Sequence, residues 1–149
     1  MFVRISLLVL CSFLSTFSLT AQKKQSAKRP SIEDKFVNIK TLSPEIFLDM
    51  KYATADNFLG QVVYDCAECY LRKATAQALV AAQKDFVARG YSLKLFDCYR
   101  PLSVQKKMWK ILPGTHYVAN PAKGSKHNRG AAVDLTLVEI ATGKEVDMG

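Results

Sequence analysis

Histidine is scarce in this sequence: only His116 and His127 are present, so any metal site or acid–base pair that needs imidazole must use one of them. The sequence has one C-x-x-C motif, Cys66 to Cys69, and no second pair to complete a structural metal site. It also lacks internal repeats and low-complexity tracts, which excludes a repeat architecture. At 149 residues the chain is long enough for one compact domain and too short for two of ordinary size.

Long apolar runs are also missing. The one near the N-terminus, Ile5 to Leu19, is shorter than the roughly 20 residues that a membrane span needs. It follows Arg4 and ends at Thr20-Ala21, as the apolar part of a secretory signal peptide does. We therefore predict that residues 1–21 are a signal peptide, that no transmembrane segment remains after cleavage, and that the mature protein is secreted or periplasmic.

Acidic residues are outnumbered, 13 against 21 lysines and arginines, which gives a formal net charge of +8. A basic balance can indicate nucleic-acid binding, but a secreted protein meets anionic envelope polymers and lipid surfaces first. A solvated surface is the simpler interpretation, because several lysines fall in the polar segment before Lys40. We expect no nucleic-acid partner.

Residues 22–40 are polar and basic and show no sustained apolar period, so they are predicted to form a basic, flexible leader. The domain is assigned to residues 41–149, and its fold is expected to begin between Phe36 and Leu42. After signal removal three cysteines remain, Cys66, Cys69 and Cys98. An oxidising compartment favours one disulfide and one free thiol, and the sequence does not indicate which two cysteines pair.

The apolar pattern predicts both helices and strands. Alanine-rich Lys73 to Arg89, followed by Gly90, is typical of a helix, and Pro101 suits the first turn of a second helix that carries Val104 to Leu112. Residues 113–126 are predicted to be an exposed loop. The predicted strands are Ile46–Lys51, Gln61–Tyr64, Tyr91–Tyr99 and Ala131–Ile140, with a turn at Thr142-Gly143-Lys144 before a returning strand from Glu145.

The most informative segment runs from Ser125 to Asp134. His127 lies on a glycine-containing turn that leads into a strand bearing Asp134. An imidazole nitrogen and a carboxylate oxygen are two of the three protein ligands that a catalytic zinc commonly has. A histidine seven residues before an aspartate is also common without a metal, so the spacing alone leaves open a surface histidine and a turn aspartate. His116 has no such partner and is interpreted as a loop histidine.

The pattern Ser-x-His-x-x-Gly-x-Ala-x-Asp, formed by Ser125, His127, Gly130, Ala132 and Asp134, resembles the zinc signature of the D-alanyl-D-alanine dipeptidase family and related cell-wall DD-peptidases. The likeness covers about residues 45 to 149. Its other parts are Asp49-Met50-Lys51-Tyr52-Ala53-Thr54, Asn57-Phe58, Leu71-Arg72-Lys73, Phe96-Asp97-Cys98-Tyr99-Arg100-Pro101 and Asp134-Leu135-Thr136-Leu137.

The resemblance implies an α+β fold, an antiparallel sheet with flanking helices like the DD-peptidase and hedgehog-like zinc fold. It also implies that one Zn²⁺ is bound by His127 and Asp134, that Arg100 stabilises the transition state, and that Ser125 lies beside the substrate. A fixed guanidinium aimed at a developing oxyanion suits that role for Arg100. A structural ion pair is the alternative for Arg100, and turn formation is the alternative for Ser125.

The sequence departs from the family pattern in one respect. Family members have a later Glu-x-x-His-type segment that supplies the catalytic base and the third zinc ligand, whereas no histidine follows His127 here. The expectation is that the domain lacks its C-terminal part, as a truncated product or an incomplete record. Zinc held by two protein ligands would bind weakly.

The function expected from the resemblance is zinc-dependent hydrolysis of the small-molecule substrate D-alanyl-D-alanine. Two alternatives stay open at this point. One is a DD-carboxypeptidase that acts on peptidoglycan stem peptides, and the other is a non-catalytic protein that binds peptidoglycan peptides.

Overall fold

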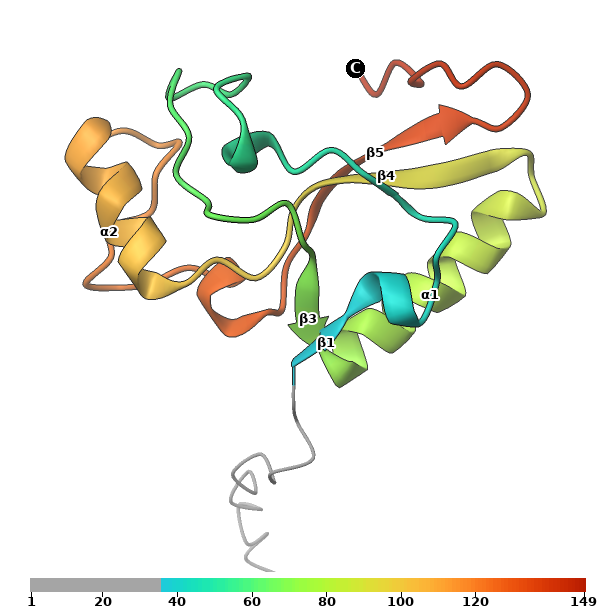
Figure 1. The fold of residues 1–149 in the computed structure, drawn as a ribbon, viewed down its shortest axis with the longest axis horizontal. Helices are drawn as coiled ribbons and strands as arrows, with labels where there is room; N and C mark the ends of the chain where they lie inside the picture. The colour runs from blue at the N-terminus through green and yellow to red at the C-terminus, as the bar shows by residue number, and fades with distance from the viewer. Residues whose placement is uncertain (1–35) are drawn as a thin grey trace, which may run out of the picture.

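The computed structural model describes residues 36–149, so the predicted signal peptide and most of the predicted leader lie outside the described residues. The main sheet has three strands in the order β2 (Phe47–Leu48), β4 (Tyr91–Asp97) and β5 (Asp134–Glu139). The central strand β4 runs antiparallel to β5 and parallel to β2. A second, two-stranded antiparallel sheet pairs β1 (Phe36–Asn38) with β3 (Tyr70–Arg72) (Figure 1).

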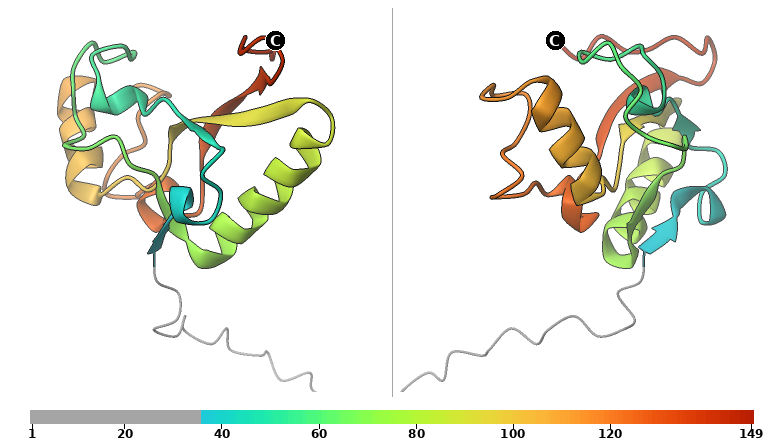
Figure 2. Two further views of the ribbon diagram at one scale, coloured as in Figure 1. Left: turned by 45° about the vertical axis from the view of Figure 1, so that its right-hand side comes forward. Right: turned by 60° about the vertical axis from the view of Figure 1, so that its left-hand side comes forward.

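Two α-helices flank these sheets, α1 (Lys73–Val87) and α2 (Leu102–Ile111). Helix α1 packs against β4, whereas α2 lies at the other end of the molecule, as the views in Figure 2 agree. Short 3-10 turns form at η1 (Ile39–Thr41), η2 (Lys51–Ala53) and η3 (His127–Arg129). The predicted α+β class is confirmed, with the difference that the sheet is mixed because of the β2–β4 pair. Within residues 36–149, no helix has the length and apolar character needed to cross a membrane.

Helix α1 is attached to β4 by a buried polar side chain as well as by apolar packing. Its buried residues Ala76, Leu79 and Gln83 recur at helical spacing along one face. The Gln83 amide donates to Ser92 Oγ at 2.9 Å, and Gln83 Oε1 accepts from the Leu93 backbone N–H at 2.8 Å. A fully buried amide is stable there because it is hydrogen-bonded. The helix therefore fixes the start of the central strand.

The β4–β5 ladder determines where the site forms. Its apolar rungs include Leu93 opposite Leu137, and Leu95 opposite Leu135. After an irregularity between Leu95 and Asp97, the last rung pairs Asp97 with Asp134. Strand alternation places Asp134 on the face opposite Leu135 and Leu137. Two carboxylates thus meet at the end of the ladder, next to the apolar Leu95–Leu135 rung.

Some predicted elements differ in the structure. Residues Gln61 to Tyr64 form no strand, because Val63 and Tyr64 are both buried instead of alternating and both of their backbone N–H groups donate to Tyr52 O. Pro101 caps α2 and does not enter its first turn. The returning segment after the turn forms a single bridge, Val138 with Glu145, in place of a strand.

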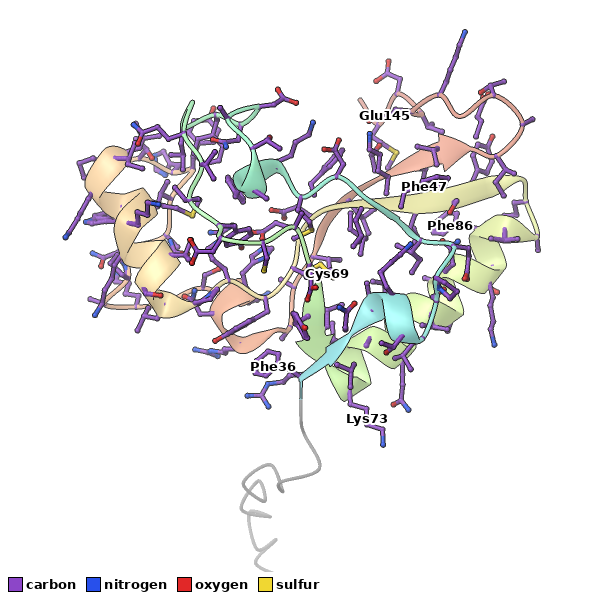
Figure 3. All side chains as sticks on the ribbon, in the orientation of Figure 1. Phe36, Phe47, Cys69, Lys73, Phe86 and Glu145 are labelled. Carbon is purple, nitrogen blue, oxygen red and sulfur yellow. A yellow bond between two sulfur atoms is a disulfide. The ribbon has the colours of Figure 1, made fainter. Side chains whose placement is uncertain are left out.

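The fold begins earlier than the predicted domain boundary at residue 41. Phe36 opens β1, and Ile39 is fully buried, so residues 36–40 belong to the ordered domain. The cysteines pair as Cys69 with Cys98, which leaves Cys66 free and exposed. Figure 3 shows Cys69 at the start of β3.

Candidate metal and catalytic site

A tight turn brings His127 to the end of the β4–β5 ladder. The turn η3 closes with Gly130, whose backbone φ is 64° and whose N–H donates to His127 O at 3.0 Å. A Cβ atom at Gly130 would lie 2.3 Å from Phe36 Cε1, so both the conformation and the space require glycine. The glycine of the sequence pattern therefore has a structural reason.

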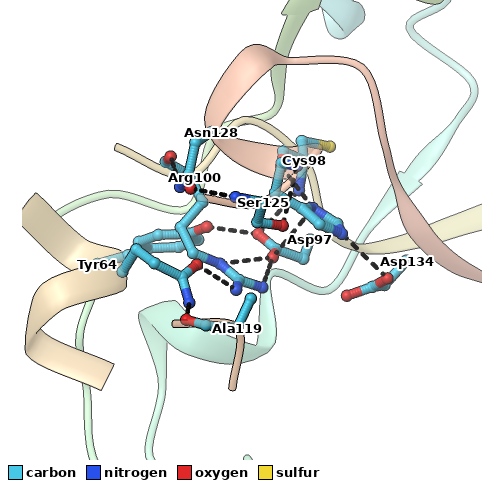
Figure 4. Close-up of polar contacts among 10 residues, drawn as sticks. Tyr64, Asp97, Cys98, Arg100, Ala119, Ser125, Asn128 and Asp134 are labelled. Carbon is cyan, nitrogen blue, oxygen red and sulfur yellow. Dashed lines mark hydrogen bonds and ion pairs between the residues drawn. The ribbon is translucent and has the colours of Figure 1, made fainter. Parts of the chain in front are cut away.

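The orientation of the His127 ring is set by a backbone carbonyl. Its Nδ1 lies 2.9 Å from Cys98 O, and since a carbonyl only accepts, Nδ1 carries the proton in this contact. The lone pair of the neutral ring is then on Nε2. This atom lies 3.4 Å from Asp134 Oδ1 (Figure 4).

The His127–Asp134 pair has the geometry of two zinc ligands. Two donors that are each about 2.0–2.2 Å from a tetrahedral zinc lie roughly 3.3–3.5 Å apart. The observed separation of 3.4 Å between Nε2 and Oδ1 agrees with this. The bond from Nδ1 to a carbonyl is also the usual outer contact of a metal-binding histidine. The residues present therefore fit a zinc ion with two inner-sphere donors.

Asp97 is the residue of this site that the sequence analysis missed. With His127 and Asp134 it forms a group of three potential ligands within the described residues. Its Oδ2 lies 3.4 Å from His127 Nδ1, but its carboxylate already accepts from Tyr64 Oη, from the Cys98 N–H at 2.9 Å and from Arg100. With its oxygens satisfied in this way, Asp97 orients the site in preference to ligating a metal.

Arg100 lies at the junction between β4 and α2, as predicted, and makes a buried ion pair with Asp97. Its Nε donates to Asp97 Oδ2 at 3.1 Å, Nη2 contacts the same oxygen, and Nη1 donates to Gln105 Oε1 at 3.0 Å. Arginine has five N–H donors. The bonds to Asp97 and Gln105 use three of them, and Tyr64 is a further hydrogen-bond neighbour of the guanidinium, so the contacts of the described residues do not take up every donor. Arg100 therefore makes the structural ion pair of the alternative interpretation and also keeps N–H groups for a ligand.

Electrostatic shifts follow this arrangement. Burial opposes a charge on His127, but the hydrogen bond to Asp134 and the charge of Asp97 outweigh it and raise the pKa of His127. The same hydrogen bond from His127 lowers the pKa of Asp134 in spite of burial. Burial likewise opposes the charge of Arg100, and Asp97 raises its pKa overall. Burial raises the pKa of Tyr52, whose ring lies 5.1 Å from the Arg100 guanidinium carbon, to about 12.

A cavity of about 290 Å³ opens beside this group of residues. Asp97 and Asp134 form part of its wall. The other lining residues are Lys51, Tyr52, Asp56, Asn57, Phe58 and Phe96. A cavity of this size is at the small end of the range of roughly 300–1,000 Å³ for ligand pockets, which suits a dipeptide-sized molecule.

Ser125 and His116 have different positions. Ser125 begins the turn: its N–H donates to Asn128 Oδ1 at 2.7 Å, and its hydroxyl accepts from the His127 N–H at 3.3 Å. These are the contacts of turn formation, and its substrate role stays a prediction. His116 is exposed in the loop between α2 and η3, outside the three-residue group, as expected. The structure thus unites Arg100, His127 and Asp134.

Comparisons with known proteins agree with the motifs. The family model described as D-ala-D-ala dipeptidase matches residues 32–149. A D-alanyl-D-alanine dipeptidase of Escherichia coli is 36% identical, over 76% of this chain and 58% of that protein. Proteins of the same name from Enterococcus faecalis (35% identical, 79% of this chain, 68% of that protein) and Streptomyces coelicolor (34%, 76% and 66%) are also similar.

The chain spans 58% of the length of the Escherichia coli relative. The matched residues 32–149 include the site residues described above, from the Asp97–Arg100 ion pair to Asp134. The match thus covers all of the residues that the structure brings together, and the chain belongs to the D-alanyl-D-alanine dipeptidase family.

Proposed function

We propose that this protein hydrolyses the D-alanyl-D-alanine dipeptide with the help of one zinc ion held by His127 and Asp134. The observation that carries the proposal is the 3.4 Å separation of His127 Nε2 and Asp134 Oδ1 beside a dipeptide-sized cavity. Three relatives that bear the name D-alanyl-D-alanine dipeptidase support the choice of substrate.

Each residue of the site has a separate role in the proposed reaction. Zinc bound here would act as a Lewis acid toward the peptide carbonyl and would activate water. His127 and Asp134 would hold the ion, and Cys98 O keeps the imidazole in the tautomer that presents Nε2. Asp97 fixes the Arg100 guanidinium, whose remaining N–H donors would stabilise negative charge on the carbonyl oxygen. Ser125 contributes a hydroxyl next to His127 in this scheme.

The catalytic base and a third zinc ligand are still to be assigned. The sequence contains no Glu-x-x-His segment, which the family resemblance predicts as their source. The test therefore compares this chain with a form extended through whatever coding sequence follows Gly149. Zinc content and D-Ala-D-Ala hydrolysis are measured side by side on both forms.

If either form holds about one zinc and cleaves the dipeptide, the proposal stands. Cleavage by the extended form alone would place the base and the third ligand downstream, and cleavage by both would require a base among the present residues. A pentapeptide stem substrate is assayed in parallel. Preference for the pentapeptide would indicate the carboxypeptidase alternative, and peptide binding without cleavage in both forms, unaffected by chelation of metal, would indicate a binding protein.

We also infer a secreted or periplasmic location and a role in cell-wall peptide metabolism. The Cys69–Cys98 disulfide supports an oxidising compartment, because structural disulfides are rare where thiols are kept reduced. Fractionation of the native host would test this location: recovery of the protein in the cytoplasm with its signal peptide attached would contradict it.

A further inference from the structure

The Cys69–Cys98 disulfide lies where the sheet ends and the site begins. Cys98 directly follows β4, one residue after the last rung of the ladder, Asp97 with Asp134. It therefore has no strand partner to hold its backbone. Both cysteines are fully buried, and their Cα atoms are 5.3 Å apart. The covalent bond thus restrains the chain at the point where the ladder hydrogen bonds stop.

Both backbone polar groups of Cys98 belong to the site. Its N–H donates to Asp97 Oδ1 at 2.9 Å, and its carbonyl accepts from His127 Nδ1 at 2.9 Å. This carbonyl is the nearest acceptor of Nδ1, with Asp97 Oδ2 at 3.4 Å from the same nitrogen, so its position favours a proton on Nδ1 and sets where Nε2 points. A shift of Cys98 would therefore be transmitted to the 3.4 Å contact of Nε2 with Asp134.

The other end of the disulfide is firmly anchored. Cys69 O accepts from the buried Ile39 N–H at 2.9 Å, and the next residues form β3, which is paired with β1. Strand β3 is hydrogen-bonded to both loops of the site. Tyr70 O accepts from the Tyr99 N–H at 3.0 Å, and the Arg72 N–H donates to Gly130 O at 3.0 Å. The disulfide thus ties the loop that carries Cys98 to the strand that supports the His127 turn.

We propose that the Cys69–Cys98 disulfide is a positioning crosslink of the metal site, which holds the Cys98 carbonyl where it selects the His127 tautomer with Nε2 free. The burial of both sulfur atoms makes it a permanent restraint and not an exchangeable thiol pair. The zinc part of this inference depends on the proposed function, whereas the tautomer of His127 does not. Cys66, three residues before Cys69 but exposed and unpaired, has no part in it.

The test replaces both cysteines, Cys69→Ala with Cys98→Ala, and uses Cys66→Ala as the matched control. Nitrogen NMR of the metal-free protein, at a pH above the raised pKa of His127 so that the ring is neutral, reports the His127 tautomer. Competition with a chromophoric chelator reports Zn²⁺ affinity, and circular dichroism reports folding. We expect the double variant to fold and to lose the single Nδ1–H tautomer. Its Zn²⁺ affinity should fall about 10–100-fold, as it does when an outer contact of a metal-binding histidine is lost. The control should match the wild type in all three measurements.

A second pair, Cys69→Val with Cys98→Ala, keeps more apolar volume in case the first pair does not fold. The proposal is overturned if a folded variant retains the wild-type tautomer and a Zn²⁺ affinity within about twofold, well short of the loss expected for an outer contact. It is also overturned if neither pair folds, because the bond would then support the whole domain and not the site. Failure of the wild type to bind zinc would count against the proposed function alone, since the tautomer measurement uses metal-free protein.

Discussion

Asp97 and Asp134 face each other across the last rung of the β4–β5 ladder, and the His127 ring lies between them with one nitrogen 3.4 Å from each carboxylate. Like charges directly opposite each other in a sheet are unfavourable. The repulsion is reduced because the two carboxylates have different partners. The buried Asp97 is neutralised by Arg100, whereas the half-exposed Asp134 has only His127 beside it among the ion pairs of the described chain. Asp134 is therefore the carboxylate available to a cation.

Removing either inner donor should abolish zinc binding at this site. His127→Ala and Asp134→Ala each delete one of the two donors, so their Zn²⁺ affinity should fall by more than the roughly 10–100-fold loss typical of an outer contact. Metal analysis after dialysis and chelator competition would measure this. His116→Ala is the matched control, because that histidine is exposed and outside the ligand group. Equal losses in the control and in the two donor variants would show that zinc binds elsewhere.

Arg100→Lys separates the two interpretations of the arginine. Lysine retains the charge near Asp97 but loses the planar fork that bonds Asp97 and Gln105 together. If Arg100 stabilises the oxyanion, kcat for D-Ala-D-Ala should fall about 10²–10³-fold with a smaller change in KM. The assay uses whichever form of the protein cleaves the dipeptide.

The exposed Arg129 supplies the control for this experiment, as Arg129→Lys makes the same exchange on the η3 turn. Thermal unfolding of both variants shows whether the buried ion pair has been weakened. A variant of Arg100 that is less stable but keeps wild-type kcat would assign the residue a purely structural role.

The sequence predicted the parts of this molecule whose pattern is local. Helix α1, the loop after α2, and the approach of His127 to Asp134 follow from apolar spacing and from a compact motif. Asp97 was missed because its role depends on distant partners, such as Tyr64 from another segment. Its position three residues before Arg100, at the end of an apolar strand, was the available signal. The cysteine pairing and the absence of a strand at residues 61–64 likewise depend on tertiary contacts.

The charge state of His127 should make the stability of the metal-free protein depend on pH. The raised pKa of His127 means that its contribution is complete below the ordinary value of about 6.5 and is lost as pH rises through the folded pKa. The lowered pKa of Asp134 means that its contribution is complete above about 4 and is lost as pH falls through the folded pKa. The stabilising pair should therefore be strongest between about pH 4 and about pH 6.5.

Chemical denaturation of the wild type and of Asp134→Asn across this pH range would measure the effect. The difference in the free energy of unfolding between the two should be largest inside that window and should decline on both sides. His116→Ala should show a difference from wild type that is flat across the same range. If the difference in the free energy of unfolding between the wild type and Asp134→Asn keeps growing at alkaline pH, the assigned ion pair is contradicted.

Gly130→Ala tests whether the close packing of the η3 turn supports the site. Gly130 and Gly124 both have positive φ, 64° and 72°, so alanine introduces similar backbone strain at each position. Only at Gly130 does the new Cβ collide, at 2.3 Å from Phe36 Cε1 and 3.1 Å from the Arg72 backbone nitrogen, whereas at Gly124 its nearest contact is 3.6 Å. Gly130→Ala should therefore lose about 1–3 kcal/mol more stability than Gly124→Ala in urea denaturation. It should also bind zinc more weakly, since the turn that carries His127 must move. Equal losses of stability in the two variants would mean that Phe36 gives way freely and that β1 does not brace the turn.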